Sequence, residues 1–202
     1  MDVFLTDTDR KKIYKAIHKK YKKVAQKPSG LFKYPTGRAG LEALQYPSEL
    51  IKALPEAAID SYCGVGNPFA LGPIDQGEAV LDIGCGSGVD AIFAAMMTGP
   101  SGKVVGIDVT PEMLTRATEN LALMDLKNVT FEEAAADNLP FAALDFDVVI
   151  SNGAFNLVPD KPRAISEVFR VLKPRGRLMI ADQILIGEQP KEKKQIIKSW
   201  SR

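Results

Sequence analysis

The second half of the chain alternates short apolar runs with amphipathic stretches. The apolar runs are rich in Val and Ile, which is typical of strands buried on both faces, and the stretches between them repeat apolar residues at helical spacing. We expect strands at 78–84, 103–109, 128–135, 146–152 and 176–186, and helices at 89–99, 110–126 and 160–173. The alternation predicts an α/β fold, a doubly wound Rossmann-like parallel sheet whose ligand crevice lies at the carboxyl ends of the strands.

The first 60 residues follow a different pattern, in which Pro and Gly separate helical stretches. Further helices are expected at 9–27, 40–45, 47–54 and 191–201. The first of them, capped by one of residues 7–9, carries an apolar stripe made of Ile13, Ile17, Tyr21 and Val24. We therefore expect residues 1–60 to form a basic helical segment that packs on the core, and residues 61–202 to form the ligand-binding domain.

Composition and charge narrow the class of protein. The chain has 202 residues, a formal net charge of +1 and 46% hydrophobic residues, as in an ordinary globular protein. This charge gives no indication of nucleic-acid binding, and no apolar run is long enough to cross a membrane. The segment from Arg10 to Arg38 holds eleven Lys or Arg and no Asp or Glu, which predicts either a solvated helix face or a surface for an acidic partner.

Cysteine usage indicates a reduced environment. Cys63 and Cys85 are too few for a disulfide framework, and the first twelve residues lack the apolar region of a secretory signal. We therefore expect a cytoplasmic protein. No spacing of Cys, His, Asp and Glu matches a metal site, so no metal is expected.

A glycine-rich turn follows the first expected strand of the sheet. Gly84, Gly86 and Gly88 let the backbone approach a ligand closely, and the helix that follows offers free N–H groups to an anion. Close strand–helix packing without a ligand would also use such glycines. Asp82 disfavours the pyrophosphate of a dinucleotide and favours a ligand with a cationic end. S-adenosylmethionine, with an ammonium, a sulfonium and one carboxylate, suits this turn better than a nicotinamide cofactor.

Asp108 ends the second expected strand, twenty residues beyond Gly88. A carboxylate at this position can accept both hydroxyls of a ribose, in nicotinamide and adenosylmethionine cofactors alike. A helix-capping role for Asp108 is less expected, because Thr110 is better placed to cap the next helix.

The motifs "VLDIGCGSG", "GIDVTPEML", "NLPF", "FDVVISN" and "RVLKPRGRLMIAD" resemble those of class I S-adenosylmethionine-dependent methyltransferases, in the right order over residues 78–186. The resemblance implies S-adenosyl-L-methionine as cofactor and S-adenosyl-L-homocysteine as product. Relatives often carry an acid where this chain has Ala135, and Asp137 or Asn138 can substitute for it. The implied cofactor-binding residues are Asp82, Gly84, Cys85, Gly86, Gly88, Asp108, Val109, Met113, Ala136, Asp137, Asn138 and Asn152.

The motifs "YPSELIKALPE", "GVGNP" and "SNGAFNLVPDK" further resemble the arsenite methyltransferase branch, whose members hold arsenic with cysteine thiolates. At two positions where that branch has cysteine, this chain has Val65 and Gly153. Cys63 lies two residues from the first of them. Two thiols cannot make a three-thiolate site, so arsenite is an expected substrate only if Cys63 acts together with external thiols.

Methyl transfer from a sulfonium needs positioning more than a dedicated acid or base, so no catalytic residue is assigned. Substrate contacts with a small-molecule acceptor are expected from Tyr34, Tyr46, Cys63 and Asn156. The alternative is a cofactor-binding or interaction module without turnover.

The expected core has five strands in the order 3-2-1-4-5 and lacks the last two strands of the family. Its fifth strand would leave an open sheet edge, through which a homodimer could form.

Overall fold

The computed structural model describes residues 5–184, 186 and 200, and the expected helix at 191–201 therefore lies, except for Trp200, outside the described residues. The described chain contains a parallel five-stranded sheet of order β3-β2-β1-β4-β5, which confirms the predicted order. Its strands are β1 (Ala79–Ile83), β2 (Lys103–Asp108), β3 (Val129–Glu133), β4 (Phe146–Asn152) and β5 (Leu172–Ala181).

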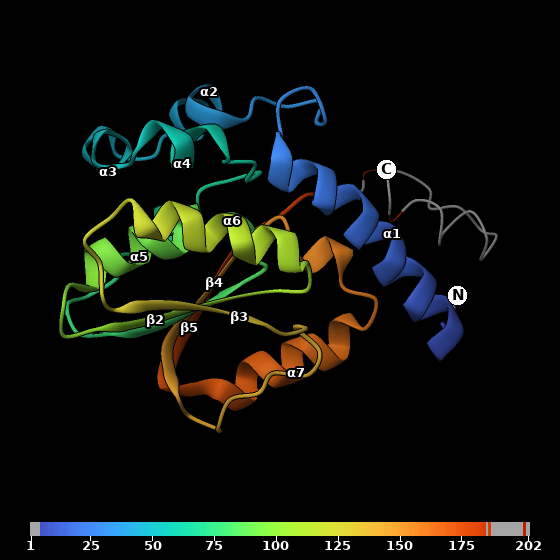
Figure 1. Cartoon of the computed structure of the whole chain (residues 1–202). Coiled ribbons are helices and arrows are strands. Elements are labelled where there is room, and N and C mark those ends of the chain that lie inside the picture. The colour runs from blue at the N-terminus through green and yellow to red at the C-terminus, as the bar shows by residue number, and fades with distance from the viewer. Residues whose placement is uncertain (1–4, 185, 187–199, 201–202) are drawn as a thin grey trace.

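Helices cover both faces of the sheet, as expected for a doubly wound fold (Figure 1). Helices α5 (Val89–Thr98) and α6 (Pro111–Ala122) lie on one face, and α7 (Lys161–Val171) lies on the other. Alternate residues of β1 divide between the two layers. Val80 packs with the alanines of α5, whereas Leu81 and Ile83 pack with Ala164, Val168 and Val171 of α7.

The N-terminal segment lies over the α5–α6 layer (Figure 1). It comprises α1 (Asp7–Gln26), α2 (Gly37–Ala43), α3 (Ser48–Ala53) and α4 (Glu56–Asp60), of which α4 was not expected. Leu41, Ile51 and Ile59 share a buried cluster with Phe93 of α5. The cap of α1 is Thr6, whose hydroxyl accepts from the Asp9 backbone N–H while the Asp9 carboxylate accepts from the Thr6 backbone N–H.

The fifth strand differs most from its predicted range. It begins at Leu172, four residues earlier than expected, because a register shift lets Leu172 pair with Phe146 before Arg177 pairs with Val148. Arg175 turns the chain there with a φ of 68°. The strand ends at Ala181, and within the described residues it pairs with β4 alone. Short 3-10 turns at Pro68–Leu71 (η1) and Phe155–Leu157 (η2) complete the described elements. No described helix is long and apolar enough to cross a membrane.

Candidate cofactor and acceptor site

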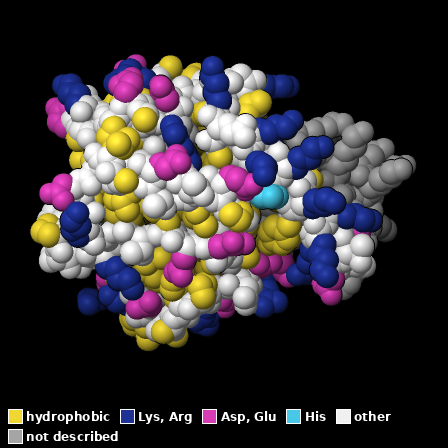
Figure 2. All heavy atoms as spheres, in the orientation of Figure 1, with side chains coloured by type: hydrophobic (Ala, Val, Ile, Leu, Met, Phe, Trp, Pro, Cys, Tyr) yellow, Lys and Arg dark blue, Asp and Glu magenta, His cyan; other side chains and the backbone are white. Residues whose placement is uncertain are grey.

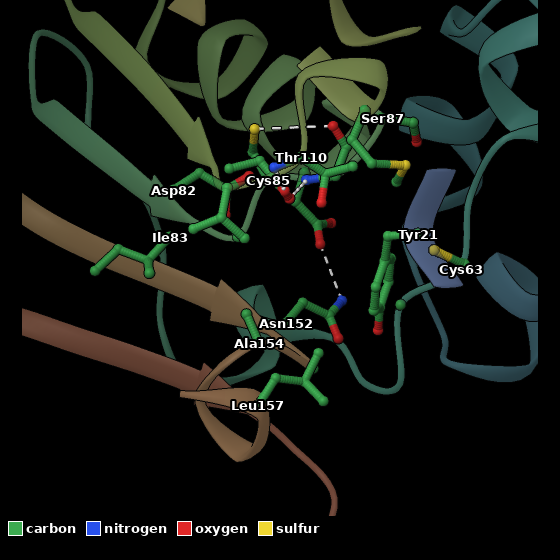
Figure 3. A pocket seen from close by; sticks show the side chains of 18 of the residues that line it. Tyr21, Cys63, Asp82, Ile83, Cys85, Ser87, Thr110, Asn152, Ala154 and Leu157 are labelled. Atoms are coloured by element: carbon green, nitrogen blue, oxygen red, sulfur yellow. Dashed lines mark hydrogen bonds between the residues drawn. The ribbon is translucent and has the colours of Figure 1, made fainter. Parts of the chain in front are cut away.

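A cavity opens at the carboxyl ends of β1, β2 and β4 (Figure 3). The loops after these strands line it, and α1 and the 62–65 loop close its other side. The lining includes Asp82, Gly84, Cys85, Gly86, Asp108, Val109, Met113, Ala136 and Asn152 of the predicted cofactor-binding set. Among the described lining residues none is Lys, Arg or His, so every charged lining group is an acid.

The glycine turn adopts backbone conformations that side chains rarely take. The φ angles of Gly84, Gly86 and Gly88 are 73°, 53° and 81°. A Cβ on Gly84 would collide with Ala154 across the cavity, and one on Gly88 would lie 2.6 Å from the ring of Phe131. Gly88 thus serves close helix–sheet packing and does not line the cavity within the described residues, whereas Gly84 and Gly86 form its floor.

Asp108 holds the start of α6 and the glycine turn together. Its Oδ1 accepts from the Thr110 backbone N–H at 2.8 Å, and its Oδ2 accepts from the Gly86 backbone N–H at 3.0 Å. Burial raises the pKa of this carboxyl. The expectation that the Thr110 side chain caps α6 was wrong. Thr110 does occupy the cap position, but its hydroxyl makes no capping bond, because the Met113 backbone N–H donates to the Thr110 carbonyl instead, at 2.9 Å.

Two further carboxyl groups lie buried in the same cavity. Asp82 is 1% exposed, and its Oδ2 has no hydrogen-bond partner among the described residues. Burial and then the neighbouring acids Asp90 and Asp108 raise the pKa of Asp82 well above its ordinary value. Asp90 accepts from the Tyr46 hydroxyl at 2.7 Å and from the Asn152 amide at 2.9 Å, and burial raises its pKa to about 6.

Asp90 was missed in the sequence. It is the second residue of α5, directly after the glycine turn. An acid in the first turn of a helix is usually explained by its favourable interaction with the helix dipole. Its burial and its place on the cavity wall distinguish it from such a residue.

The side of the cavity expected to meet an adenine is mostly apolar. Val109, Met113 and Ala136 line it, together with Ala134. Asp137 and Asn138 lie outside the described lining, and as cofactor ligands they remain predictions. The Asp137 carboxylate accepts from the Tyr14 hydroxyl at 3.3 Å, and this contact joins Asp137 to α1.

Helix α1 forms a roof that the sequence did not reveal. Tyr14, Ile17 and Tyr21 line the cavity from this helix, at the spacing of one helical face. Glu112 of α6 accepts from His18 and pairs with Lys22, each at 2.8 Å, and Arg10 pairs with Asp160 at 2.9 Å. Figure 2 shows this face, with the chain's single histidine beside an acidic side chain and the basic side chains gathered near α1. The predicted basic segment thus presents its lysines outward while its apolar stripe covers the site.

Opposite the glycine turn lies the wall expected to meet the acceptor. Tyr34 and Cys63 line the cavity, and the Tyr34 hydroxyl donates to the Cys63 carbonyl at 3.1 Å. Burial raises the pKa of the Cys63 thiol to about 12, and burial also raises the pKa of Cys85. Both thiols are therefore protonated at neutral pH, the weaker form for nucleophilic attack or metal binding.

Two of the four predicted substrate residues lie outside the described lining. Tyr46 is 4% exposed and reaches the site through hydrogen bonds with Asp90, Asn152 and Tyr62. The backbone N–H of Asn156 donates to Asp182, and its side chain does not line the cavity. Over the described residues, no group of three or more His, Cys, Asp and Glu could hold a metal ion.

Val65 and Gly153 lie next to each other on the acceptor wall. A Cβ on Gly153 would lie 3.2 Å from Cγ2 of Val65. These two positions, where the resemblance to the arsenite methyltransferase branch implies cysteines, therefore meet in space although they lie far apart in the sequence. Here they provide an apolar contact without a sulfur atom.

Comparison with known proteins agrees with this geometry. The family model described as a methyltransferase domain matches residues 74–202. An arsenite methyltransferase of Halobacterium salinarum is 41% identical over 155 residues, which cover 77% of this chain and 39% of that protein. The chain spans half or less of the length of the curated arsenite methyltransferases of H. salinarum and Aquipseudomonas alcaligenes that it matches.

Two solved structures share the fold. CrArsM, an arsenic(III) S-adenosylmethionine methyltransferase from Chlamydomonas reinhardtii, superposes with a TM-score of 0.56 and 34% identity, covering 74% of this chain and 50% of that one. A SAM-dependent methyltransferase from Aquifex aeolicus gives a TM-score of 0.54 at 26% identity, covering 74% and 76% of the two chains. The chain belongs to the methyltransferase domain family, and it is similar to arsenite methyltransferases and to SAM-dependent methyltransferase structures.

Proposed function

We propose that this chain transfers the methyl group of S-adenosylmethionine to a small-molecule acceptor other than arsenite. The observation that carries the proposal is the meeting, in one cavity, of the glycine turn, the unpartnered carboxylate of Asp82 and the carboxylate of Asp108. Three buried acids without a lining cation favour a ligand with positive charge.

The residues present fit such a cofactor. Asp82 has a free oxygen for a cationic group, directly or through water, and Asp108 lines the cavity with a carboxylate that can accept from ribose hydroxyls. Gly84 and Gly86 line the cavity with backbone that no side chain covers, and Val109 with Met113 offers an apolar surface to a flat base.

The bound cofactor would supply an activated methyl group on a sulfonium. An acceptor held in line would form its new bond to the methyl carbon while the electrons of the carbon–sulfur bond stayed on sulfur, and a proton on the attacking atom would leave to solvent. The chain's own task is to hold the acceptor in line and to exclude water, which Tyr14, Ile17 and Tyr21 of the roof support.

Arsenite is disfavoured as acceptor by the acceptor wall. Val65 and Gly153 bring no sulfur, and the one lining thiol on this wall, Cys63, is protonated at neutral pH. A soft metalloid needs thiolates in place of its hydroxides. Cys63 together with external thiols would be the remaining route, and a Cys63→Ser variant isolates it.

The test is methyl transfer from labelled S-adenosylmethionine across a panel of phenols, amines, thiols and arsenite, the last with and without glutathione. We expect S-adenosylhomocysteine to form with at least one organic acceptor, at a rate that Cys63→Ser leaves within twofold. Arsenite turnover that Cys63→Ser abolishes would overturn the acceptor assignment. Cofactor binding without turnover on any acceptor would favour a binding module instead.

A further inference from the structure

The side chain of Asn152 holds the acceptor wall by its backbone. Asn152 ends β4, and its Oδ1 accepts from the N–H groups of Val65 and Gly66 at 2.8 and 3.1 Å. Its Nδ2 donates to the Gly66 carbonyl at 2.8 Å and to Oδ2 of Asp90 at 2.9 Å. One side-chain amide thus bonds both the N–H groups and a carbonyl of the 65–66 backbone, and it also donates to Asp90.

Asp90 is in turn held from the opposite side. Its Oδ1 accepts from the Tyr46 hydroxyl at 2.7 Å, and the Tyr62 hydroxyl lies 3.1 Å from that of Tyr46. Burial raises the pKa of both tyrosines far above their ordinary value, so both remain hydrogen-bond donors. A Cβ on Gly64 would collide with Asn152 and with the Tyr62 hydroxyl, so the loop has no room to shift toward this network.

The network connects the two ends of the cavity. Asp90 and Asp82 interact electrostatically at the cofactor end, and Val65 lies at the acceptor end. Asp90 and Asn152 both line the cavity between them, and Figure 3 shows the hydrogen bond that reaches Asn152 from the glycine-turn side.

We propose that Asp90 is a positioning residue that couples the cofactor end of the cavity to the acceptor wall, through Asn152 and the 65–66 backbone. This inference rests on the proposed function. A cationic ligand beside Asp82 and Asp90 offsets the cost of keeping a charge on the buried Asp90 carboxylate. An ionised carboxylate accepts a stronger hydrogen bond from Asn152 than a protonated one does, which holds the amide and the loop more firmly. The bound cofactor therefore stabilises an acceptor wall that the Asn152 contacts already shape before it binds.

The test is amide hydrogen exchange at Val65 and Gly66, with and without saturating S-adenosylmethionine. In the wild-type chain we expect the cofactor to slow exchange at these two amides at least tenfold. Asp90→Asn keeps the shape and can keep both hydrogen bonds, with its oxygen facing Asn152 and its amide facing Tyr46, but it carries no charge. In Asp90→Asn the two amides should exchange as slowly as in the wild type without cofactor, but the cofactor should no longer slow them further. In Asp90→Ala they should exchange faster even without cofactor, and the cofactor should not slow them.

Asp147→Asn is the matched control, because Asp147 also accepts a hydrogen bond, from the Ala79 backbone N–H at 2.9 Å, but lies at the opposite end of β4 from Asn152 and outside the described cavity lining. In this control the cofactor should slow exchange at Val65 and Gly66 as much as in the wild type. An unchanged slowing of exchange in Asp90→Asn at confirmed saturation would overturn the coupling. Calorimetry of the wild type separates this failure from that of the proposed function: if S-adenosylmethionine does not bind at all, both fall, and if it binds without the predicted exchange pattern, only the coupling falls.

Discussion

The Oδ2 atom of Asp108 accepts a 3.0 Å hydrogen bond from the backbone N–H of Gly86, and so the end of β2 is fastened to the turn that follows β1. The partner oxygen holds the first turn of α6 through Thr110. The residue expected to receive a ribose is therefore also the residue that shapes the glycine turn. A ligand that contacts Asp108 and the turn meets one rigid unit, which reduces the entropy lost on binding.

Gly88→Ala should destabilise the fold more than an equivalent change elsewhere. Gly88 has a φ of 81°, and a Cβ would lie 2.6 Å from Phe131 and 2.9 Å from Ala117. We expect a loss of roughly 2–4 kcal/mol in the free energy of unfolding, from left-handed backbone strain plus overpacking. Gly30→Ala is the control, because Gly30 has a φ of 79° with nothing within 4 Å, and it should lose only about 1–2 kcal/mol. Equal losses in denaturant titrations would contradict this packing role.

Glu112→Gln should loosen the roof over the cavity. Glu112 holds His18 and Lys22 of α1, and these contacts lower the pKa of its carboxyl to about 2. Because exposed ion pairs contribute little, we expect a loss of about two- to fivefold in S-adenosylmethionine affinity at low salt, shrinking at high salt. Asp125→Asn, which removes an exposed pair with Lys127 far from α1, is the control. A loss of affinity that does not depend on salt, or an equal loss in Asp125→Asn, would contradict the view that the ion pairs of Glu112 hold α1 over the cavity.

The contribution of Asp90 to stability should fall as pH rises from about 4 to about 6. Burial raises the pKa of Asp90 from 3.8 to about 6. Between these two pH values Asp90 is ionised in the unfolded chain but still protonated in the folded protein, so its contribution to the free energy of unfolding falls as pH rises. Asp90→Asn removes the effect. Its free energy of unfolding should match the wild type near pH 4 and exceed it at pH 7, by up to about 3 kcal/mol for a two-unit shift. Unfolding curves with the same pH dependence in both proteins would show that Asp90 ionises freely.

The strand order and the glycine turn could be predicted because local patterns determine them. Apolar runs separated by helical stretches leave few topologies for a parallel sheet, and the glycines mark one strand–turn–helix junction. The position of Asp108 could be inferred in the same way, since it ends a strand. Its bond to Gly86 could not, because that contact depends on how two neighbouring loops pack.

The roof and the Asp90 network depend on contacts between distant segments. An apolar stripe on a helix shows that one face is covered but not what covers it, so Ile17 and Tyr21 were assigned to that stripe without a link to the cavity, and Tyr14 was not singled out. Tyr46 was expected near the acceptor, and the structure instead buries it with its hydroxyl on Asp90, 44 residues further along the chain. Such polar contacts leave no periodic signal in a single sequence.

The most direct test of the account is a calorimetric titration of the chain with S-adenosylmethionine, repeated with Asp108→Ala. We predict saturable binding of one equivalent in the micromolar range, weakened at least a hundredfold by the substitution, because it removes the ribose ligand and releases the turn. The folded state of the variant is checked by its circular dichroism and unfolding curve. Absence of binding to the folded wild-type chain, or equal affinity in Asp108→Ala, would contradict the assignment of this cavity to the cofactor.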